Sequence, residues 1–431
     1  MILKKNQIIS IGLKNIEVIS PLGEGGQGEV YLVALDNEQY ALKVYIEKPS
    51  IEFIDNLKNN IDRGSPCETF LWPKMFVELP DGHVGYLMDL RPSNYSSFVS
   101  YLNAKTYFKD DSTMLKWCIS LCASFKKLHE CGFSYQDLND GSFFLDPMTG
   151  DLLICDNDNV TANNSNLGIL GKMRYMAPEI VRGEAEPDVH SDRFSLAVIL
   201  FMALCMGNPY EGENLKNYDL VDEQAELEMF GTNPIFVYHK TNRENRPIRG
   251  YHSSLIKRWP RIPLYIKETF HRTFVDGLKD RENERTPEIE WIKLLSKYRD
   301  ELVTCSCGGQ YKYGLEENHK VEHCCYCNTL KPSRLYMEIN KYKIILEPGK
   351  EIFKTHMDKY STEYNTVVGT VVTSKNNPSI WGIKMNHSGV TLTDSFGNSK
   401  EIGENKVIPI IQDSSITFKN GVVASIKLAN I

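Results

Sequence analysis

Two acidic clusters in apolar surroundings hold the residues of this chain that are best suited to chemistry. The first surrounds Asp137, and the second contains Asp156 and Asp158 directly after an apolar run. Phosphoryl transfer needs one carboxylate that orients the attacking hydroxyl and another that binds Mg²⁺ beneath a triphosphate. We therefore predict that Asp137 orients a hydroxyl and that Asp156 binds Mg²⁺.

A glycine-rich segment precedes these clusters and lies between two expected strands. Gly23, Gly25, Gly26 and Gly28 let the backbone turn tightly and approach phosphate oxygens closely. A strand follows the last glycine, which disfavours a dinucleotide-binding fold, where a helix would follow. Lys43 lies in the next, otherwise apolar strand and needs an anionic partner there. Together these residues predict a phosphate cradle.

Apolar periodicity predicts the elements that must position these groups. Strands are expected at 16–20, 28–34, 39–45 and 85–90, and helices at 50–61, 112–128, 192–206, 265–278 and 288–302. After residue 332, short strands broken by turn residues predict a small β-sandwich. The expected fold class is α+β, with a sheet-rich lobe, a helical lobe and a C-terminal sandwich.

The composition describes an ordinary folded protein. Hydrophobic residues make up 42% of the 431 residues and charged residues 24%. The net charge of −7 argues against general nucleic-acid affinity. The longest apolar stretch, residues 194–206, is too short to cross a bilayer, and no signal peptide is evident. We expect a cytoplasmic protein with no membrane span and no nucleic-acid partner.

Five of the 11 cysteines crowd into one short segment. Their odd total and the lack of a secretion signal disfavour a disulfide framework. The spacing predicts a closed structural Zn²⁺ site held by Cys305, Cys307, Cys324 and Cys327. Only one residue separates the first pair, so other ligands stay possible: Cys325, His319 or His323. Reactive or redox-active cysteines are the other interpretation.

Taken in order, the motifs from residue 16 to residue 302 resemble a eukaryotic-type protein kinase. The glycine segment, Lys43 and the strand at 85–90 match the nucleotide lobe, and Arg-Tyr-Met-Ala-Pro-Glu at 174–179 matches the end of an activation segment. The resemblance implies a bilobal kinase-like domain at 10–302, with a small lobe at 10–90 and a helical lobe at 91–302. It also implies ATP, Mg²⁺ and a protein substrate.

The same resemblance assigns roles to single residues. Asp137 and Lys43 would be catalytic, and Asp192 would brace the catalytic loop. Glu179 and Arg285 would form a buried ion pair. The implied nucleotide-binding set, with Met88 as gatekeeper, is Gly23, Gly25, Gly26, Gly28, Val30, Ala41, Lys43, Met88, Asp89 and Leu90.

Several positions depart from the kinase pattern. Gln136 replaces the arginine to which a phosphorylated activation loop usually docks, which predicts activation without loop phosphorylation. Asn139, kept as a catalytic position, replaces a lysine that steadies the transferred phosphoryl group. Ser142 replaces an asparagine that binds Mg²⁺, and its hydroxyl is a shorter ligand. Asp158 either completes a metal site with Asp156 and Ser142 or caps a turn.

The partner of Lys43 stays open at this point. A kinase carries a glutamate for this lysine on the helix that follows, and the helix expected at 50–61 offers only Glu52 and Asp55. Asp156 is the alternative partner.

The variant motifs resemble a bacterial kinase branch that carries a zinc ribbon behind the catalytic domain. Its kinases are encoded beside a metal-dependent protein phosphatase and a von Willebrand A protein, in tellurite-resistance-like triads, which implies these two proteins as partners. The ribbon would span 303–333. Residues 334–431 faintly resemble a forkhead-associated domain, although Lys354 and His356 are poor counterparts of its phosphothreonine-binding residues. We expect a sandwich for protein contact, with phosphopeptide binding as the alternative.

Two functions fit these features. The first is an ATP- and Mg²⁺-dependent protein serine/threonine kinase, favoured by Lys43, Asp137 and Asp156. The second is a nucleotide-binding pseudokinase scaffold that recruits partners through its C-terminal modules, favoured by Asn139 and Ser142. A small-molecule phosphotransferase is disfavoured, because such enzymes generally lack the Ala-Pro-Glu segment.

Overall fold

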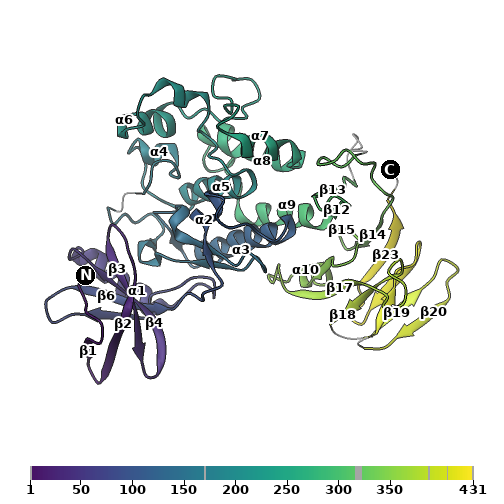
Figure 1. Cartoon of the computed structure of the whole chain (residues 1–431), viewed down its shortest axis with the longest axis horizontal. Helices are drawn as coiled ribbons and strands as arrows, with labels where there is room; N and C mark the ends of the chain where they lie inside the picture. The colour runs from purple at the N-terminus through teal and green to yellow at the C-terminus, as the bar shows by residue number, and fades with distance from the viewer. Residues whose placement is uncertain (1, 169–170, 316–322, 387–388, 405, 430–431) are drawn as a thin grey trace. The chain divides into compact units, whose positions relative to one another are not determined.

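The computed structural model describes residues 2–168, 171–315, 323–386, 389–404 and 406–429. The chain forms two compact units, whose elements are labelled in Figure 1. The first unit comprises Met1–Phe108, Ser124–Arg258 and Glu268–Glu288, and the second comprises Lys109–Ala123, Trp259–Lys267 and Ile289–Ile431. None of the helices within the described ranges is long and apolar enough to cross a membrane.

A six-stranded antiparallel sheet, drawn in purple in Figure 1, opens the first unit. In the order β1-β2-β3-β4-β6-β5, its strands are Ile8–Ile11, Lys14–Glu24, Gly28–Leu35, Glu38–Tyr45, Val84–Asp89 and Met75–Glu78. Asp36 and Asn37 adopt left-handed conformations, which suit the two-residue turn between β3 and β4. The four strands expected from the sequence are therefore confirmed.

Alternation along the strands gives the sheet two apolar faces. One face gathers Val18, Val33, Leu42 and Val44. The other packs against helix α1 (Ile51–Arg63) through Ala41, Tyr45 and Tyr86 with Leu57. Side chains two positions apart on a strand share a face, so Lys43 points to the same side as Ala41 and Tyr45. The two-residue alternation along β4 thus places Lys43 on the face of the sheet that α1 covers.

The remainder of the first unit is mainly helical. Its helices are α2 (Phe98–Leu102), the last part of α3 (Asp111–Glu130), α4 (Pro178–Val181), α5 (Val189–Cys205), α6 (Glu223–Glu226), α7 (Ser253–Arg258) and most of α8 (Leu264–Val275). Asp188 and Ser191 form a capping box at the start of α5, and every residue of this helix from Phe194 to Cys205 is buried in the core. The helices expected at 112–128, 192–206 and 265–278 are confirmed, the last one with a final 3₁₀ turn.

Short strands of the first unit carry the two acidic clusters. They are β7 (Ser96–Ser97), β8 (Phe133–Ser134), β9 (Phe143–Leu145), β10 (Leu152–Ile154) and β11 (Thr161–Ala162). The β9–β10 hairpin ends where Cys155 N donates to Ser142 O at 2.9 Å, and β8 pairs with β11. The hairpin thus brings Ser142 next to the segment that contains Asp156.

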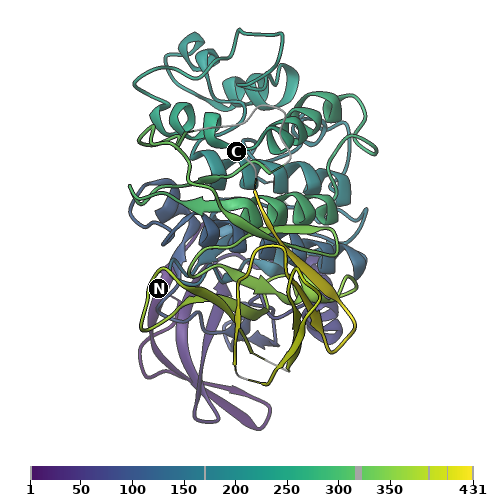
Figure 2. The ribbon, with the colours of Figure 1, turned by 90° about the vertical axis from the view of Figure 1, so that its right-hand side faces the viewer.

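The second unit contains helix α9 (Glu288–Glu301), except its first residue, and two sheets seen from another side in Figure 2. A small hairpin joins β12 (Leu302–Thr304) to β13 (Gln310–Lys312). The first sheet, β15-β14-β23-β22-β19-β20, contains Tyr342–Ile345, Leu335–Ile339, Val423–Leu428, Ser415–Phe418, Val390–Thr393 and Ser399–Ile402. The second sheet, β16-β17-β18-β21, contains Glu351–Phe353, Val367–Thr373, Trp381–Met385 and Val407–Pro409. One apolar core unites side chains of both sheets, as a sandwich requires.

Polar contacts inside the second unit explain why it includes helical segments. The side-chain amide of Asn365 donates to Lys116 O and to Ser120 Oγ on α3, each at 2.9 Å, and Asn365 Oδ1 accepts from Arg299 at 2.6 Å. Lys350 donates to Leu302 O at 2.7 Å. These contacts attach part of α3 and α9 to the strands. Nearly all of α9 thus lies in the second unit, and the three segments expected at 10–302, 303–333 and 334–431 stay a prediction.

Candidate active site

Lys43 on β4 places its ammonium group in a buried cluster of acids and phenols. Its Nζ atom lies 2.8 Å from Asp158 Oδ2 and 3.5 Å from Asp156 Oδ1. The Lys43 side chain is 8% exposed, against 0% for Asp158 and 44% for Asp156. Burial lowers the pKa of Lys43, but the carboxylates of Asp158 and Asp156 outweigh it and raise that pKa above its ordinary value. Lys43 is therefore a fixed cation with two acidic partners.

Asp158 accepts hydrogen bonds at both of its carboxylate oxygens. The Tyr45 hydroxyl donates to Oδ2 at 2.6 Å, beside Lys43, and the Tyr86 hydroxyl donates to Oδ1 at 3.0 Å. Burial raises the pKa of Asp158, but Lys43 and the two phenols outweigh it and lower that pKa overall. A buried carboxylate with three donors is a satisfied anion. Both of its oxygens thus have donors within the protein.

Helix α1 is attached to this region by amides instead of acids. The side-chain nitrogens of Asn56 and Asn60 both donate to Val160 O, at 2.8 Å and 2.7 Å. Glu52 and Asp55, the acids that the sequence offered as partners of Lys43, are exposed. Lys43 is thus held by residues that follow β10, and α1 contributes neutral hydrogen bonds.

Asp137 lies just after β8, and its carboxylate is oriented by a neighbouring amide. Asn139 Nδ2 donates to Asp137 Oδ1 at 2.9 Å, while Asn139 Oδ1 accepts from Gly141 N at 2.9 Å. Burial raises the pKa of Asp137, although the Asn139 hydrogen bond and the positive charge of Lys172 lower it in part. A carboxylate with a raised pKa is better able to take a proton from a hydroxyl.

Lys172, which the sequence did not single out, lies beside this loop. Its Nζ atom is 3.0 Å from Asn139 Oδ1 and 3.2 Å from Asp140 Oδ1. The preceding residue, Gly171, packs closely, because a Cβ there would lie 3.2 Å from the Met176 side chain and 3.4 Å from Asp137 Oδ1. Gly171 therefore lets the segment that contains Lys172 approach Asp137.

Asp156 and Ser142 have the properties of Mg²⁺ ligands. The Asp156 carboxylate is 44% exposed. The Ser142 hydroxyl is buried beside the Tyr135 phenol, and no described residue makes a well-aligned hydrogen bond to it. Oxygen ligands of this kind suit Mg²⁺. Asp156 has φ 55° and Gln136 has φ 62°, so a strained left-handed residue stands at each acidic cluster. The fold maintains these conformations at the groups expected to do chemistry.

Four residues of the predicted nucleotide-binding set, Val30, Ala41, Met88 and Leu90, lie in one apolar cluster on the α1 side of the sheet. Ala41 and Met88 are buried in one apolar cluster, and Val30, Leu90 and Leu153 pack against it. Gly25 N donates to Gly28 O at 2.9 Å, which closes the glycine turn. A Cβ at Gly28 would lie 2.5 Å from Val44 O, whereas Gly23 and Gly26 face open space. The Asp89 side chain pairs with Lys74 at 2.5 Å.

A buried network braces the catalytic loop from behind. Asp192 Oδ2 accepts from Tyr135 N at 2.8 Å and lies 3.1 Å from His129 Nε2, while His129 Nδ1 lies 3.0 Å from Glu288 Oε1. Burial lowers the pKa of His129, but the two carboxylates outweigh it and raise that pKa to about 9. His129 is therefore an imidazolium at neutral pH. The bracing contact expected of Asp192 is confirmed.

Two further expectations concern the activation segment. The Arg285 guanidinium binds Glu179 in a bidentate manner, with both N···O distances at 2.7 Å, so the predicted ion pair is confirmed. Gln136 donates to Thr161 Oγ1 at 2.7 Å and to the Ser165 carbonyl. A neutral amide thus fastens the start of the segment. Ser165, a hydroxyl of this segment that could accept a phosphate, is exposed.

The structure brings the four predicted zinc ligands together in the second unit. Their sulfur atoms all lie within 4.8 Å of one another, with Cys305–Cys327 at 3.6 Å and Cys307–Cys324 at 3.9 Å. Sulfurs bound about 2.3 Å from a tetrahedral Zn²⁺ lie about 3.8 Å apart, so the set fits the ion. Hydrogen bonds from Thr329 lower the pKa of Cys327 to about 6. Cys325 and His323 are not part of this set, and His319 lies outside the described residues.

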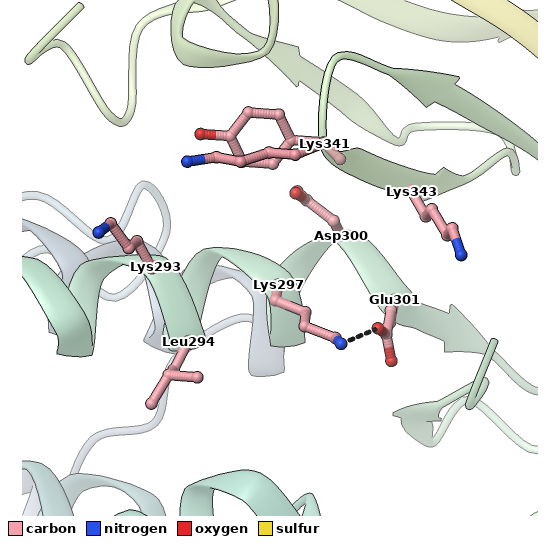
Figure 3. A pocket seen from close by; sticks show the side chains of 8 residues that line it. Lys293, Leu294, Lys297, Asp300, Glu301, Lys341 and Lys343 are labelled. Carbon is pink, nitrogen blue, oxygen red and sulfur yellow. Dashed lines mark ion pairs between the residues drawn. The ribbon is translucent and has the colours of Figure 1, made fainter. Parts of the chain in front are cut away.

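A pocket of about 230 Å³ in the second unit is lined by lysines and acids (Figure 3). Lys293, Lys297, Lys341 and Lys343 line it together with the acids Asp300 and Glu301. Asp300 Oδ2 lies 3.0 Å from His356 Nε2, and His356 is fully buried. The histidine that the sequence compared with a phosphothreonine reader is thus used inside the unit.

Comparison with known proteins establishes the family. The protein kinase domain model matches residues 16–261, more than half of the chain. The chain belongs to the protein kinase family. The serine/threonine-protein kinase AtPK2/AtPK19 of Arabidopsis thaliana is 24% identical over 250 residues, which cover 56% of this chain and 52% of that kinase.

Other relatives in the family match at similar identity. Human cGMP-dependent protein kinase 2 is 24% identical over 220 residues, 48% of this chain and 28% of that kinase. The kinase sck2 of Schizosaccharomyces pombe is 25% identical over 224 residues, 48% of this chain and 33% of that kinase. The chain spans about half or less of the length of these kinases.

Three residues of the candidate site escaped the sequence interpretation. The alternation along the expected strands at 39–45 and 85–90 places Tyr45 and Tyr86 on the face of Lys43, and this signal was not used. Lys172 carries no such signal. Its approach to Asn139 depends on the path of the activation segment, which spacing alone does not give.

Proposed function

We propose that this protein is an ATP- and Mg²⁺-dependent protein serine/threonine kinase. The observation that carries the proposal is the 3.5 Å approach of Lys43 Nζ to Asp156 Oδ1. In active kinases the strand lysine and the Mg²⁺-binding aspartate meet at the phosphates of ATP. Asp137, with its raised pKa, supplies the group that accepts a proton. Together these three residues support catalysis over a purely binding role.

The chemistry assigns one task to each part of the site. A serine or threonine oxygen attacks the γ-phosphorus, the bond to the β–γ bridging oxygen breaks, and ADP leaves. Asp137 orients the hydroxyl and takes its proton, while Lys43 and the glycine turn hold the phosphates. Asp156 and Ser142 would hold Mg²⁺, which neutralises phosphate charge when bound. The apolar cluster around Met88 encloses the adenine.

Asp158 is assigned to Lys43 instead of Mg²⁺. Its two oxygens already receive Lys43, Tyr45 and Tyr86, and its side chain is fully buried. A metal ion at Asp158 would have to share these oxygens with the three donors in a fully buried site. We infer that Asp158 does the work usually done by a helix glutamate, namely to keep the lysine in the phosphate-binding position.

The proposal is tested by phosphoryl transfer from γ-labelled ATP to a panel of serine- and threonine-containing proteins. Wild type should transfer label, and Asp137→Ala should reduce transfer by about 1,000-fold or more, within the range known for loss of a principal catalytic group. ATP binding should persist in that variant. Equal counts from both proteins, with ATP still bound, would instead establish the pseudokinase scaffold.

We also propose that Cys305, Cys307, Cys324 and Cys327 hold one structural Zn²⁺ ion. The support is the mutual approach of the four sulfurs and their fit to tetrahedral coordination. Protein purified without chelator should contain one zinc per chain by elemental analysis. Cys327→Ser should lose it, whereas Cys325→Ser should retain it as the matched control. Retention of full zinc by Cys327→Ser would refute this ligand set.

The resemblance to the bacterial branch supports a proposal about partners. We propose that a metal-dependent protein phosphatase and a von Willebrand A protein act with this kinase. Co-expression of the three proteins with labelled ATP should reveal phosphate on the von Willebrand A protein and its removal by the phosphatase. A von Willebrand A protein that never acquires label from an active kinase would refute it.

A further inference from the structure

The catalytic loop lacks a cation of its own next to Asp137, because Asn139 is neutral. The ammonium group of Lys172 nevertheless lies close by, on the other side of the Asn139 side-chain amide. Lys172 Nζ is 3.0 Å from Asn139 Oδ1, and Asn139 Nδ2 is 2.9 Å from Asp137 Oδ1. The amide of Asn139 therefore links an ammonium group on its oxygen side to the carboxylate on its nitrogen side.

The ammonium group of Lys172 keeps one donor available. An ammonium carries three N–H groups, and the acceptors for two of them are Asn139 Oδ1 and Asp140 Oδ1. The third has no acceptor among the described residues. The Lys172 side chain is 56% exposed, so this donor faces solvent beside the loop. It is free to meet an anion that arrives with the substrate.

The backbone that carries Lys172 is anchored close to the loop. Tyr175 N donates to Lys172 O at 2.9 Å, and Asn208 Nδ2 donates to Arg174 O at 3.0 Å. The Arg174 guanidinium also lies 2.8 Å from Glu211 Oε1. Together with the close approach at Gly171, these contacts fix the position from which Lys172 extends. An unanchored surface lysine would have no such restriction.

We propose that Lys172 is a catalytic residue that contacts the transferred phosphoryl group and supplies the positive charge that Asn139 cannot. Asn139 then acts as a positioning residue for both Lys172 and Asp137. The inference rests on the proposed kinase function and deepens it. In this arrangement the activation segment, and not the catalytic loop, carries the positive charge. Phosphoryl transfer would therefore require that this segment is correctly placed.

A charge placed at the transition state affects turnover more than substrate binding. We expect Lys172→Met to lower kcat by about 100-fold or more, the range for loss of one such donor, while the KM for ATP changes by less than about 3-fold. Lys216→Met is the matched control, because Lys216 is 57% exposed and pairs with Glu213 at 2.8 Å. The control should leave both constants unchanged. Equal kcat values for wild type and Lys172→Met would overturn the proposal.

A second-site exchange separates charge from structure. Asn139→Lys in the Lys172→Met background returns a cation to the catalytic loop and should recover at least about 10-fold of the lost kcat, since the missing interaction is electrostatic. A purely structural role of Lys172 predicts no recovery. No recovery in a double variant with wild-type thermal stability would count against the assigned role.

A binding measurement separates this inference from the kinase proposal itself. With Mg²⁺ present, ADP–aluminium fluoride imitates the transferring phosphoryl group and should bind wild type more tightly than ADP does. Lys172→Met should bind ADP normally and lose most of this added affinity. Wild type without any tightening would overturn the kinase proposal and this inference together. Tightening that is equal in wild type and Lys172→Met would overturn the role of Lys172 alone.

Discussion

The two charged groups of the candidate active site, around Lys43 and around Asp137, are built in opposite ways. The Lys43 group is closed, with Asp158 fully buried under Lys43, Tyr45 and Tyr86. The Asp137 group is open, because its cation, Lys172, is 56% exposed and comes from the activation segment.

This difference divides two tasks between two kinds of environment. Buried, fully bonded charges are not screened and keep a fixed geometry, which suits the binding of phosphates that arrive in every cycle. An exposed cation on a separate segment can adapt to the protein substrate, although solvent weakens it. Binding of nucleotide should therefore depend on the closed group, and transfer should depend on the open one.

The largest expected effect comes from removing the buried anion of the closed group. Asp158→Asn leaves Lys43 with Asp156 alone, and breaking a buried ion pair costs about 3–5 kcal/mol. We expect that loss in the free energy of unfolding by urea denaturation. The control is Asp36→Asn, whose exposed pair with Lys14 at 3.1 Å should contribute below about 1 kcal/mol. If Asp158→Asn and Asp36→Asn lost similar amounts of unfolding free energy, the Lys43 group would be no more stabilising than an exposed ion pair, which would contradict the account.

The network of His129, Asp192 and Glu288 behind the open group predicts that the free energy of unfolding depends on pH. The expected change is almost as large as the loss expected for Asp158→Asn. The pKa of His129 is raised from 6.5 to about 9, so its stabilising charge is fully present below pH 6.5 and is lost as the pH rises to 9. The shift corresponds to about 3 kcal/mol in the free energy of unfolding. His129→Gln should flatten the stability profile between these pH values. A variant profile as steep as that of wild type would show that other groups cause the slope.

A smaller effect is expected from single donors of the closed group. Tyr86→Phe leaves Asp158 Oδ1 without its phenol, and a hydrogen bond to a charged group contributes about 2 kcal/mol. Calorimetric unfolding should detect this loss. The matched variant Tyr40→Phe, whose hydroxyl donates to the exposed Glu38, should unfold like wild type. A stable Tyr86→Phe would mean that Asp158 does not depend on this donor.

The sequence was a good guide to what local pattern determines and a poor guide to contacts across segments. It predicted the strand of Lys43, the pair of Glu179 with Arg285, and the brace at Asp192, because ordered motifs fix these elements. It left the partner of Lys43 open, and Asp158 was weighed only as a metal ligand or a turn cap. The observed pair joins β4 to the turn after β10, far apart in the chain, so no local periodicity reveals it.

The smallest effect is expected at the start of the activation segment. Gln136 fastens this segment through neutral hydrogen bonds to Thr161 and Ser165 O, so we expect that the segment needs no phosphate there. Ser165→Ala should therefore change kcat by less than about 2-fold, because surface substitutions away from special contacts have small effects. Steady-state transfer by protein dephosphorylated before assay provides the comparison. A loss of tenfold or more would restore loop phosphorylation as the switch.

The division of tasks between the two groups is tested most directly by measuring KM for ATP and kcat in one assay for Asp158→Asn and Lys172→Met. The account predicts that Asp158→Asn raises KM for ATP by at least about 10-fold, since Lys43 loses its closest partner, whereas Lys172→Met lowers kcat and leaves KM nearly unchanged. If Lys172→Met raised KM and Asp158→Asn did not, or if both variants kept wild-type values, the account would be contradicted.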